Sequence, residues 1–267
     1  MKYDLFVSDF DGTLGIAPDH IEKETLLAIE KYQQKGGKFA IVTGRMYSSI
    51  RPICLKYNLK GIVISYQGAM INDIETGESL FTGGIDYKLA ARVAKDFLDE
   101  GVQTVVDIDD IMIYNERSDY TNYYETAVGV TGKLCDDIVG LVLKEKKVVQ
   151  KVGTICSPED SIRLTKKFEK KYGKELVVNN GSSHLVEVIS KKCSKKIAVE
   201  FLADYYNIPH DRIIAVGDST NDLEMLKGDW HGVCVGDGRE ELKKIAKEIT
   251  VPYKDNPIKV LMEKYCL

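Results

Sequence analysis

The chain has 267 residues, of which 44% are hydrophobic and 29% are charged, and its formal net charge is −4. This length suits one large domain or two small ones, and the composition is that of a folded globular protein. Basic residues are spread along the chain and form no stripe interleaved with aromatic side chains, so the sequence gives no reason to expect nucleic-acid binding.

Targeting and redox features predict a cytoplasmic protein. The first residues lead directly into a strand rather than into a signal peptide. No apolar run reaches the roughly 20 residues that a membrane-spanning helix needs. The six cysteines are scattered without a C-x-x-C pair, so we expect reduced thiols and neither a zinc site nor a disulfide framework.

The N-terminal part alternates strands with helices. Short apolar runs predict buried strands at 5–7, 39–42 and 62–65. Apolar residues at helical spacing predict helices at about 21–35 and 48–57 between them. This alternation is typical of right-handed crossovers and a parallel sheet.

A different pattern begins near residue 82, where a helix is followed by two strands and the same order then appears again. The predicted elements are a helix around 89–97, strands at 103–108 and 111–116, a helix at 157–172, and strands at 175–178 and 184–189 joined by a turn at 179–182. The pattern favours an antiparallel sheet covered by helices. We therefore predict an inserted domain over residues 83–190, within a core formed by 1–82 and 191–267.

The last part returns to alternation and completes the first sheet. Ser194 predicts the start of a helix over 195–206. The elements expected after it are a strand at 212–216, a helix starting near 220, a strand at 231–235 and a helix at 240–247. The fold class is therefore α/β, with a Rossmann-like parallel-sheet core and an inserted second α/β domain.

Two charged segments of the insert have a structural interpretation. The lysine-rich stretches 144–151 and 166–174 are broken by acidic and apolar residues, so we expect them to be solvated faces. Asp107, Asp109 and Asp110 resemble a second metal site, but strand alternation and a tight turn favour a hairpin.

The chemistry is expected where the core strands end. Asp9 and Asp11 follow the first strand, Thr43 follows the second, and Asp218 with Asp222 follows a later one. The carboxyl ends of parallel strands meet at one edge of a sheet, which is where such folds bind ligands. Two carboxylates ~4 Å apart repel by ~4 kcal/mol at an effective dielectric of ~20, so the group requires a cation, a shared proton, or both.

The same residues indicate phosphoryl transfer assisted by a metal. Carboxylates suit a hard cation, and Mg²⁺ typically takes one or two of them while leaving positions for water and a phosphate. Lys195 lies in the first turn of a predicted helix, where backbone N–H groups already favour an anion. Lys195, the Thr43 hydroxyl and the helix terminus together would accommodate the charge of the phosphate.

Four segments resemble, in order, the signature motifs of the haloacid dehalogenase (HAD) superfamily: Asp9–Leu14, Thr43–Arg45, Lys195 and Gly217–Asp222. The insert between the second and third motifs resembles the α/β cap of the Cof-type phosphatases in that superfamily. The resemblance spans nearly the whole chain, and the first and last motifs together are its most specific part. One departure is Gln67-Gly68-Ala69, which stands where the family usually carries Asn-Gly-Ala.

The resemblance implies a role for each matching residue. Asp9 would be the nucleophile that forms an aspartyl-phosphate, and Asp11 the general acid and then the base, a role that the neighbouring anions would favour by keeping it protonated. Mg²⁺ would bind the Asp9 carboxylate, the Asp11 backbone carbonyl and the Asp218 carboxylate, with Asp222 in the outer shell. The phosphate ligands would be Thr43, Gly44, Lys195 and Asn221. The candidates for substrate specificity are His20, Arg45 and His184.

The expected function is a Mg²⁺-dependent phosphatase of small phosphorylated metabolites, such as sugar phosphates. A phosphomutase or phosphotransferase acting on a sugar phosphate would need the same core residues, so it stays open as an alternative. A phospholigand-binding module without turnover is the third possibility, and its hallmark would be loss of Asp9 or Asp11. The partner is a small phosphate ester rather than nucleic acid or membrane, and the sequence leaves the oligomeric state open.

Overall fold

The computed structural model describes residues 1–16 and 19–267. The chain divides into two compact units, one formed by 1–81 with 194–267 and the other by 82–193. We call them the core unit and the inserted unit. None of the described helices combines the length and the apolar character needed to cross a bilayer.

The core unit is built on a sheet whose described strands run in the order β14-β13-β12-β1-β2-β3-β4-β5. Its strands are β1 (Leu5–Asp9), β2 (Lys38–Val42), β3 (Ile62–Ser65), β4 (Met70–Asp73), β5 (Ser79–Thr82), β12 (Ile213–Gly217), β13 (His231–Cys234) and β14 (Glu248–Ile249). The strands from β14 to β3 pair in parallel, and β4 pairs with β3 in antiparallel fashion. The predicted α/β class with a parallel core sheet is confirmed.

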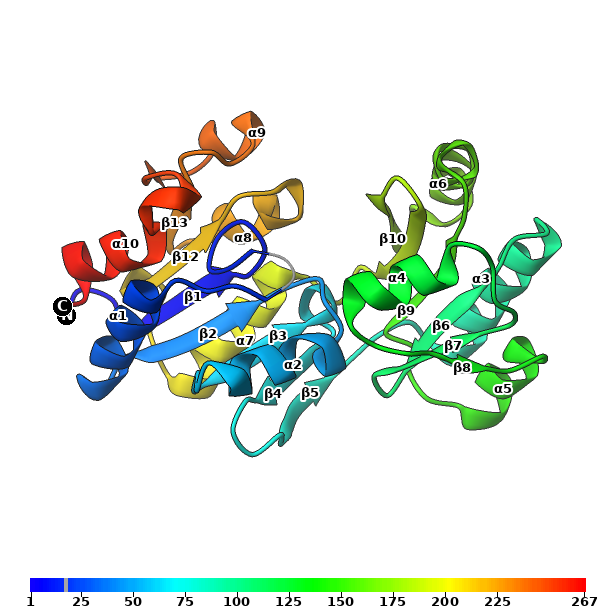
Figure 1. The fold of residues 1–267 in the computed structure, drawn as a ribbon, viewed down its shortest axis with the longest axis horizontal. Helices are drawn as coiled ribbons and strands as arrows, with labels where there is room; N and C mark the ends of the chain where they lie inside the picture. The colour runs from blue at the N-terminus through cyan, green and yellow to red at the C-terminus, as the bar shows by residue number, and fades with distance from the viewer. Residues whose placement is uncertain (17–18) are drawn as a thin grey trace. The chain divides into compact units, whose positions relative to one another are not determined.

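Helices cover both faces of this sheet (Figure 1). They are α1 (Lys23–Gln34), α2 (Tyr47–Lys56), α7 (Lys195–Tyr206), α8 (Leu223–Leu226), α9 (Glu240–Lys243) and α10 (Pro257–Tyr265), with short 3₁₀ turns η1 (Tyr66–Gly68), η2 (His210–Arg212), η3 (Thr220–Asp222) and η4 (Tyr253–Asp255). Successive residues of β1 face opposite sides. Phe6 packs with α1, α2 and α10, whereas Leu5 and Val7 pack with α7, α8 and α9.

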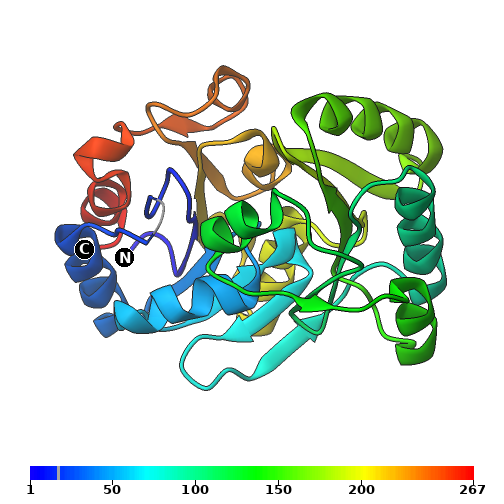
Figure 2. The ribbon, with the colours of Figure 1, turned by 45° about the vertical axis from the view of Figure 1, so that its right-hand side comes forward.

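Both ends of the chain lie beside α1 and α10, as Figure 2 shows. The backbone N–H of Lys2 donates to the carbonyl of Tyr265 at 2.8 Å, which ties the N-terminal segment to the last helix. The buried residues Leu261 and Met262 belong to the same cluster as Ile29 of α1. The termini are therefore fixed by packing as well as by a backbone hydrogen bond.

The inserted unit contains a second sheet, whose described strands run in the order β10-β11-β9-β6-β7-β8. Its elements are α3 (Tyr87–Asp99), β6 (Val105–Ile108), β7 (Ile111–Tyr114), α4 (Thr121–Val128), β8 (Lys133–Leu134), α5 (Ile138–Glu145), β9 (Lys151–Ile155), α6 (Pro158–Tyr172), β10 (Leu176–Ser182) and β11 (Leu185–Ser190). The pairings are antiparallel except for β7 with β8. Apolar residues of α3, α5 and α6 pack on one face, so an antiparallel sheet covered by helices is confirmed.

Several elements of the insert differ from the prediction. The expected turn at 179–182 is wrong, because β10 continues to Ser182 through an irregular register and β11 begins at Leu185. Strand β9, which the pattern did not indicate, lies between β11 and β6. The hairpin at Asp109 and Asp110 is confirmed, since φ is +51° and +63° there, as a type I′ turn requires.

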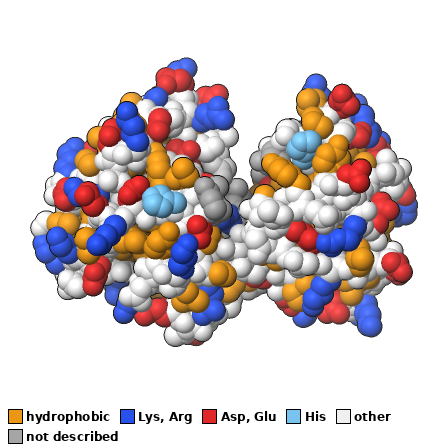
Figure 3. Space-filling model, in the orientation of Figure 1, with side chains coloured by type: hydrophobic (Ala, Val, Ile, Leu, Met, Phe, Trp, Pro, Cys, Tyr) orange, Lys and Arg blue, Asp and Glu red, His pale blue; other side chains and the backbone are white. Residues whose placement is uncertain are grey.

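The lysine-rich stretch 144–151 is not wholly a solvated face. Its last residue, Lys151, begins β9 and is buried between Asp107 and Glu187. Most other charges lie on the surface, and on the face drawn in Figure 3 basic and acidic side chains are interspersed. That face shows no extended basic patch.

Candidate active site

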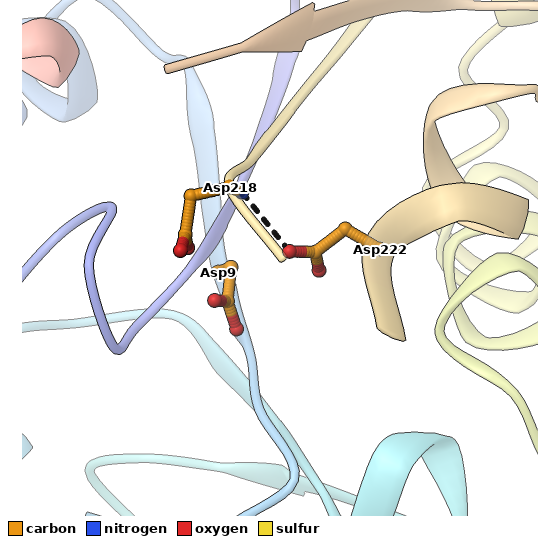
Figure 4. A group of neighbouring side chains, drawn as sticks. All are labelled: Asp9, Asp218 and Asp222. Atoms are coloured by element: carbon orange, nitrogen blue, oxygen red, sulfur yellow. Dashed lines mark hydrogen bonds between the residues drawn. The ribbon is translucent and has the colours of Figure 1, made fainter. Parts of the chain in front are cut away.

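Three carboxylates meet where two neighbouring strands end (Figure 4). Asp9 is the last residue of β1, Asp218 directly follows β12, and these strands pair in parallel, so their carboxyl ends lie together. Asp222 is the last residue of the turn η3, which begins two residues after Asp218. One oxygen from each carboxylate lies within 4.8 Å of the others, although the residues are up to 213 positions apart in the chain.

A buried ammonium group neutralises part of this charge. Lys195 is the first residue of α7, which the Ser194 hydroxyl caps by accepting the backbone N–H of Ile197 at 3.2 Å. Its Nζ donates to Asp9 Oδ1 and to Asp222 Oδ1, each at 2.7 Å. Burial opposes the charge of Lys195, but Asp222 and Asp9 outweigh it and raise the pKa of the ammonium.

The pKa of Asp9 lies well above its ordinary value. Burial is the main cause, because Asp9 is only 4% exposed, and the charge of Asp222 adds to it. The ammonium of Lys195 acts in the opposite direction but does not compensate. Ionised Asp9 therefore requires more positive charge than Lys195 supplies.

Both carboxylate oxygens of Asp222 accept hydrogen bonds from the protein. While its Oδ1 accepts from Lys195, its Oδ2 accepts the backbone N–H groups of Asp218 and Ser219, each at 3.0 Å. It is fully buried, and these bonds fix the backbone at Asp218 and Ser219, just before the turn. Asp222 is therefore better placed to orient other groups than to bind a cation directly.

Asp218 is held on its other side by the first loop. The hydroxyl of Thr13 donates to its Oδ1 at 2.8 Å, and burial raises the pKa of Asp218. Gly12 has φ of +82°, and a Cβ there would lie 2.8 Å from Asp218 Oδ2. This position excludes larger residues for both reasons. The sequence does not predict this partner of Thr13, because the two residues are 205 positions apart.

The donor set fits a hard divalent cation. All three side chains offer oxygen ligands, which Mg²⁺ prefers. Three carboxylates with one ammonium leave an excess of negative charge that one divalent ion would balance. Asp9 and Asp218 are the direct ligands that this arrangement favours, because Lys195 and Thr13 bind Oδ1 of these carboxylates and leave Oδ2 to face a cation.

Asp11 does not join this carboxylate group. Its side chain is half-exposed and accepts two hydrogen bonds from the guanidinium of Arg45, at 2.9 Å from Nε and 2.6 Å from Nη2. The guanidinium carbon of Arg45 also lies 4.8 Å from the centre of the Phe10 ring. The charged neighbour that this conformation gives to the Asp11 side chain is thus the cation Arg45.

The predicted phosphate ligands lie around the same edge. Thr43 is buried, and its Oγ1 accepts the backbone N–H of Arg45 at 3.1 Å. A Cβ on Gly44 would lie 2.4 Å from Nε2 of Gln67, whose side chain covers the glycine. The Nδ2 of Asn221 lies 3.4 Å from Oε1 of Gln67. Gln67 thus belongs to the site, a role that its departure from the family pattern did not reveal.

The structure shows the local contacts of the two histidines that were proposed for substrate specificity. His20 is exposed, and its Nε2 lies 3.0 Å from a carboxylate oxygen of Glu22. His184 belongs to the inserted unit, where its Nδ1 lies 3.1 Å from the carbonyl of Cys156 and its ring stacks on Tyr120. Neither is part of the carboxylate group.

Comparison with known proteins identifies relatives over the whole length. Residues 6–261 match the family model described as haloacid dehalogenase-like hydrolase. The chain is 25% identical to the 5-amino-6-(5-phospho-D-ribitylamino)uracil phosphatase YitU of Bacillus subtilis, covering 98% of this chain and 97% of that protein.

Solved structures agree with the fold. A crystal structure from Thermotoga maritima superimposes with a TM-score of 0.88 at 23% identity, covering 98% of this chain and 97% of the other. A HAD/COF-like hydrolase from Plasmodium vivax gives a TM-score of 0.84 at 21% identity, with coverage of 98% and 95%. At these identities the likeness concerns the fold.

Proposed function

Because the chain belongs to the haloacid dehalogenase-like hydrolases, of the Cof type, we propose that it is a Mg²⁺-dependent phosphatase of small phosphorylated metabolites that uses Asp9 as its nucleophile. The observation that carries this proposal is the buried Asp9 at the end of β1, with Asp218, Asp222 and Lys195 around it. Hydrolysis of a ribityl phosphate, as the name of the B. subtilis relative describes, is one reaction of this class.

In the first step an oxygen of Asp9 attacks phosphorus, the bond from phosphorus to the ester oxygen breaks, and Asp11 gives its proton to the departing alkoxide. In the second step Asp11 takes a proton from water as that water attacks phosphorus. The bond to Asp9 then breaks, which regenerates the carboxylate and releases inorganic phosphate. Splitting one displacement into two gives each step a well-positioned nucleophile.

The charges around Asp9 are suited to this sequence. Lys195, Thr43 and the Gly44 backbone would hold the phosphoryl oxygens, whose stabilisation usually supplies the largest part of such catalysis. Asp9, the Asp11 carbonyl and Asp218 would hold Mg²⁺, with Asp222 in the outer shell. The bound ion would neutralise charge on the phosphate and keep Asp9 ionised.

Arg45 has a part in this scheme. While it pairs with Asp11, both carboxylate oxygens of Asp11 accept hydrogen bonds from its guanidinium. A phosphate ester brings a second anion for the guanidinium, and Arg–phosphate pairs are as favourable as Arg–carboxylate pairs. We infer that substrate binding draws Arg45 away from Asp11, so that the Asp11 carboxylate can take up from solvent the proton that it then gives to the departing alkoxide.

The test is hydrolysis of a panel of phosphate esters, including p-nitrophenyl phosphate, with Mg²⁺. Wild-type protein should release inorganic phosphate, and Asp9→Asn should lower turnover by at least about 10⁴-fold, since loss of a nucleophile costs as much or more in other enzymes. Asp19→Asn, on an exposed carboxylate paired with Lys56, is the matched control and should leave turnover unchanged.

Two results would contradict the proposal. Turnover that survives Asp9→Asn would exclude Asp9 as the nucleophile. Conversion of a sugar phosphate to an isomer or to a second phosphorylated product, without release of inorganic phosphate, would indicate the mutase or phosphotransferase alternative.

A further inference from the structure

The loop of residues 66–69, which follows β3, has an unusual backbone. Tyr66 and Gln67 both have positive φ, at +51° and +58°, and Gly68 follows at +110°. A residue with a Cβ adopts this left-handed region at a cost, and two in succession are rare. Such conformations persist only where the surroundings hold them, and they concentrate at functional sites.

The surroundings that hold this loop are segments of the proposed active site. The N–H groups of Tyr66 and Gln67 donate to the carbonyls of Arg45 at 2.9 Å and Thr43 at 3.0 Å. A Cβ on Gly68 would lie 2.4 Å from the carbonyl oxygen of Ser194, so the loop packs tightly on the start of α7, which carries Lys195. The backbone of this loop therefore fixes the position of the second motif, Thr43–Arg45, relative to the third, Lys195.

The side chain of Gln67 extends this connection to the fourth motif. Its Oε1 accepts from Nδ2 of Asn221 at 3.4 Å, and its Nε2 lies against Gly44. At 3.4 Å the bond is near the upper limit for a hydrogen bond.

We propose that Gln67 is a positioning residue for the phosphatase reaction, which fixes the carboxamide of Asn221 relative to the phosphate-binding loop at Gly44. The left-handed turn orients the Gln67 side chain, and the amide of this side chain contacts the loops that carry Gly44 and Asn221. Asn221 is exposed and lies in a short 3₁₀ turn, so little else restrains its side chain. This inference rests on the proposed function.

The test is a double-mutant cycle of Gln67→Met and Asn221→Ala, read as kcat and KM for p-nitrophenyl phosphate with Mg²⁺. Methionine keeps the length of the side chain but provides no amide. Gln67→Met should lower kcat by about tenfold to a hundredfold, as small misplacements of reacting groups do. In the Asn221→Ala background the same substitution should have almost no effect, because Gln67 acts through Asn221.

Two further variants separate positioning from folding. Gln67→Gly suits the positive φ, so it should keep or raise the melting temperature while losing kcat to the same extent as Gln67→Met. Gln34→Met is the matched control, since Gln34 lies on the exposed face of α1 and hydrogen-bonds to Glu30 of the same helix at 3.3 Å. It should change neither kcat nor melting temperature.

The outcomes divide as follows. Additive effects of Gln67→Met and Asn221→Ala, or a kcat for Gln67→Gly equal to that of the wild type, would overturn the role of Gln67 while leaving the phosphatase in place. Wild-type protein that hydrolyses no phosphate ester would instead overturn the proposed function.

Discussion

Each unit of this protein buries a lysine between two carboxylates, and the comparison of the two is instructive. In the core unit, Lys195 Nζ lies 2.7 Å from both Asp9 and Asp222. In the inserted unit, Lys151 Nζ lies 3.2 Å from Asp107 and 3.1 Å from Glu187, and it donates to the hydroxyl of Tyr124 at 3.0 Å. The two groups have the same charges and similar burial.

The two groups differ in which elements supply their charged residues. Asp107, Lys151 and Glu187 lie on the adjacent strands β6, β9 and β11, so the sheet itself brings them together. The other group gathers beyond the ends of parallel strands, from loops and a helix start, and adds Asp218 as a third carboxylate. The lesson is that a buried ion pair alone does not indicate a site. An excess of carboxylates at the edge of a sheet where parallel strands end does indicate one.

Removing each lysine should separate the two groups most strongly. Lys195→Met should lower kcat for p-nitrophenyl phosphate by about 10²–10³-fold, because a charge that stabilises the transferring phosphoryl group is lost. Lys151→Met should lower the free energy of unfolding by about 3–5 kcal/mol, since it leaves the buried Asp107 and the partly buried Glu187 without their cation, yet keep turnover per folded molecule.

Turnover at 15 °C and unfolding in urea measure the two effects, and Lys166→Met on an exposed face of α6 serves as the control for both. Loss of turnover in folded Lys151→Met would remove the distinction between the two groups.

The pH dependence of stability should reveal the second group. Burial raises the pKa of Asp107 from 3.8 to about 6, with Lys151 opposing the change. The folded protein therefore holds a proton that the unfolded chain releases. This contribution to stability is fully present below pH 3.8 and is lost as the pH rises through about 6, by about 3 kcal/mol in all.

Asp107→Asn should abolish that part of the decline between pH 4 and pH 7 in urea unfolding. Asp109→Asn, on the exposed turn of the same hairpin, should retain it. An unchanged pH profile in Asp107→Asn would show that Asp107 ionises normally.

Mg²⁺ should distinguish the groups in the absence of substrate. An ion that binds only the folded protein raises the free energy of unfolding by about 2.7 kcal/mol at a hundred times its Kd. Melting temperature should rise with added Mg²⁺ and fall on chelation. Asp218→Asn should remove this response, and Glu187→Gln in the inserted unit should keep it. A response that survives Asp218→Asn would place the ion elsewhere.

Local rules predicted much of this architecture. The helix start at Lys195 follows from the Ser194 cap, and that of α6 follows from Ser157 with proline at its first position. Placement of Asp9 and Asp218 at one edge follows from strand alternation and the geometry of parallel sheets. These features depend on residues close in sequence or on a general topological rule.

Long-range pairings were not predictable in the same way. Arg45 holds Asp11 across 34 positions, and Asn221 meets Gln67 across 154, so each depends on the final geometry of loops. Strands β4 and β5 lie between residues 70 and 82, where no element was predicted, and β14 is too short to give a periodic signal. Burial of Lys151 depends on partners from two other strands, and a lysine-rich segment does not predict such partners.

The adjacent termini have a consequence for how the polypeptide can be reconnected. Lys2 is hydrogen-bonded to Tyr265, and both ends lie beside α1 and α10, so a short peptide could join them into a ring. Opening that ring at the exposed hairpin turn of Asp109 and Asp110 would yield a circular permutant. In that permutant the two segments of the core unit would be contiguous in sequence, while every strand pairing of the core sheet would be retained.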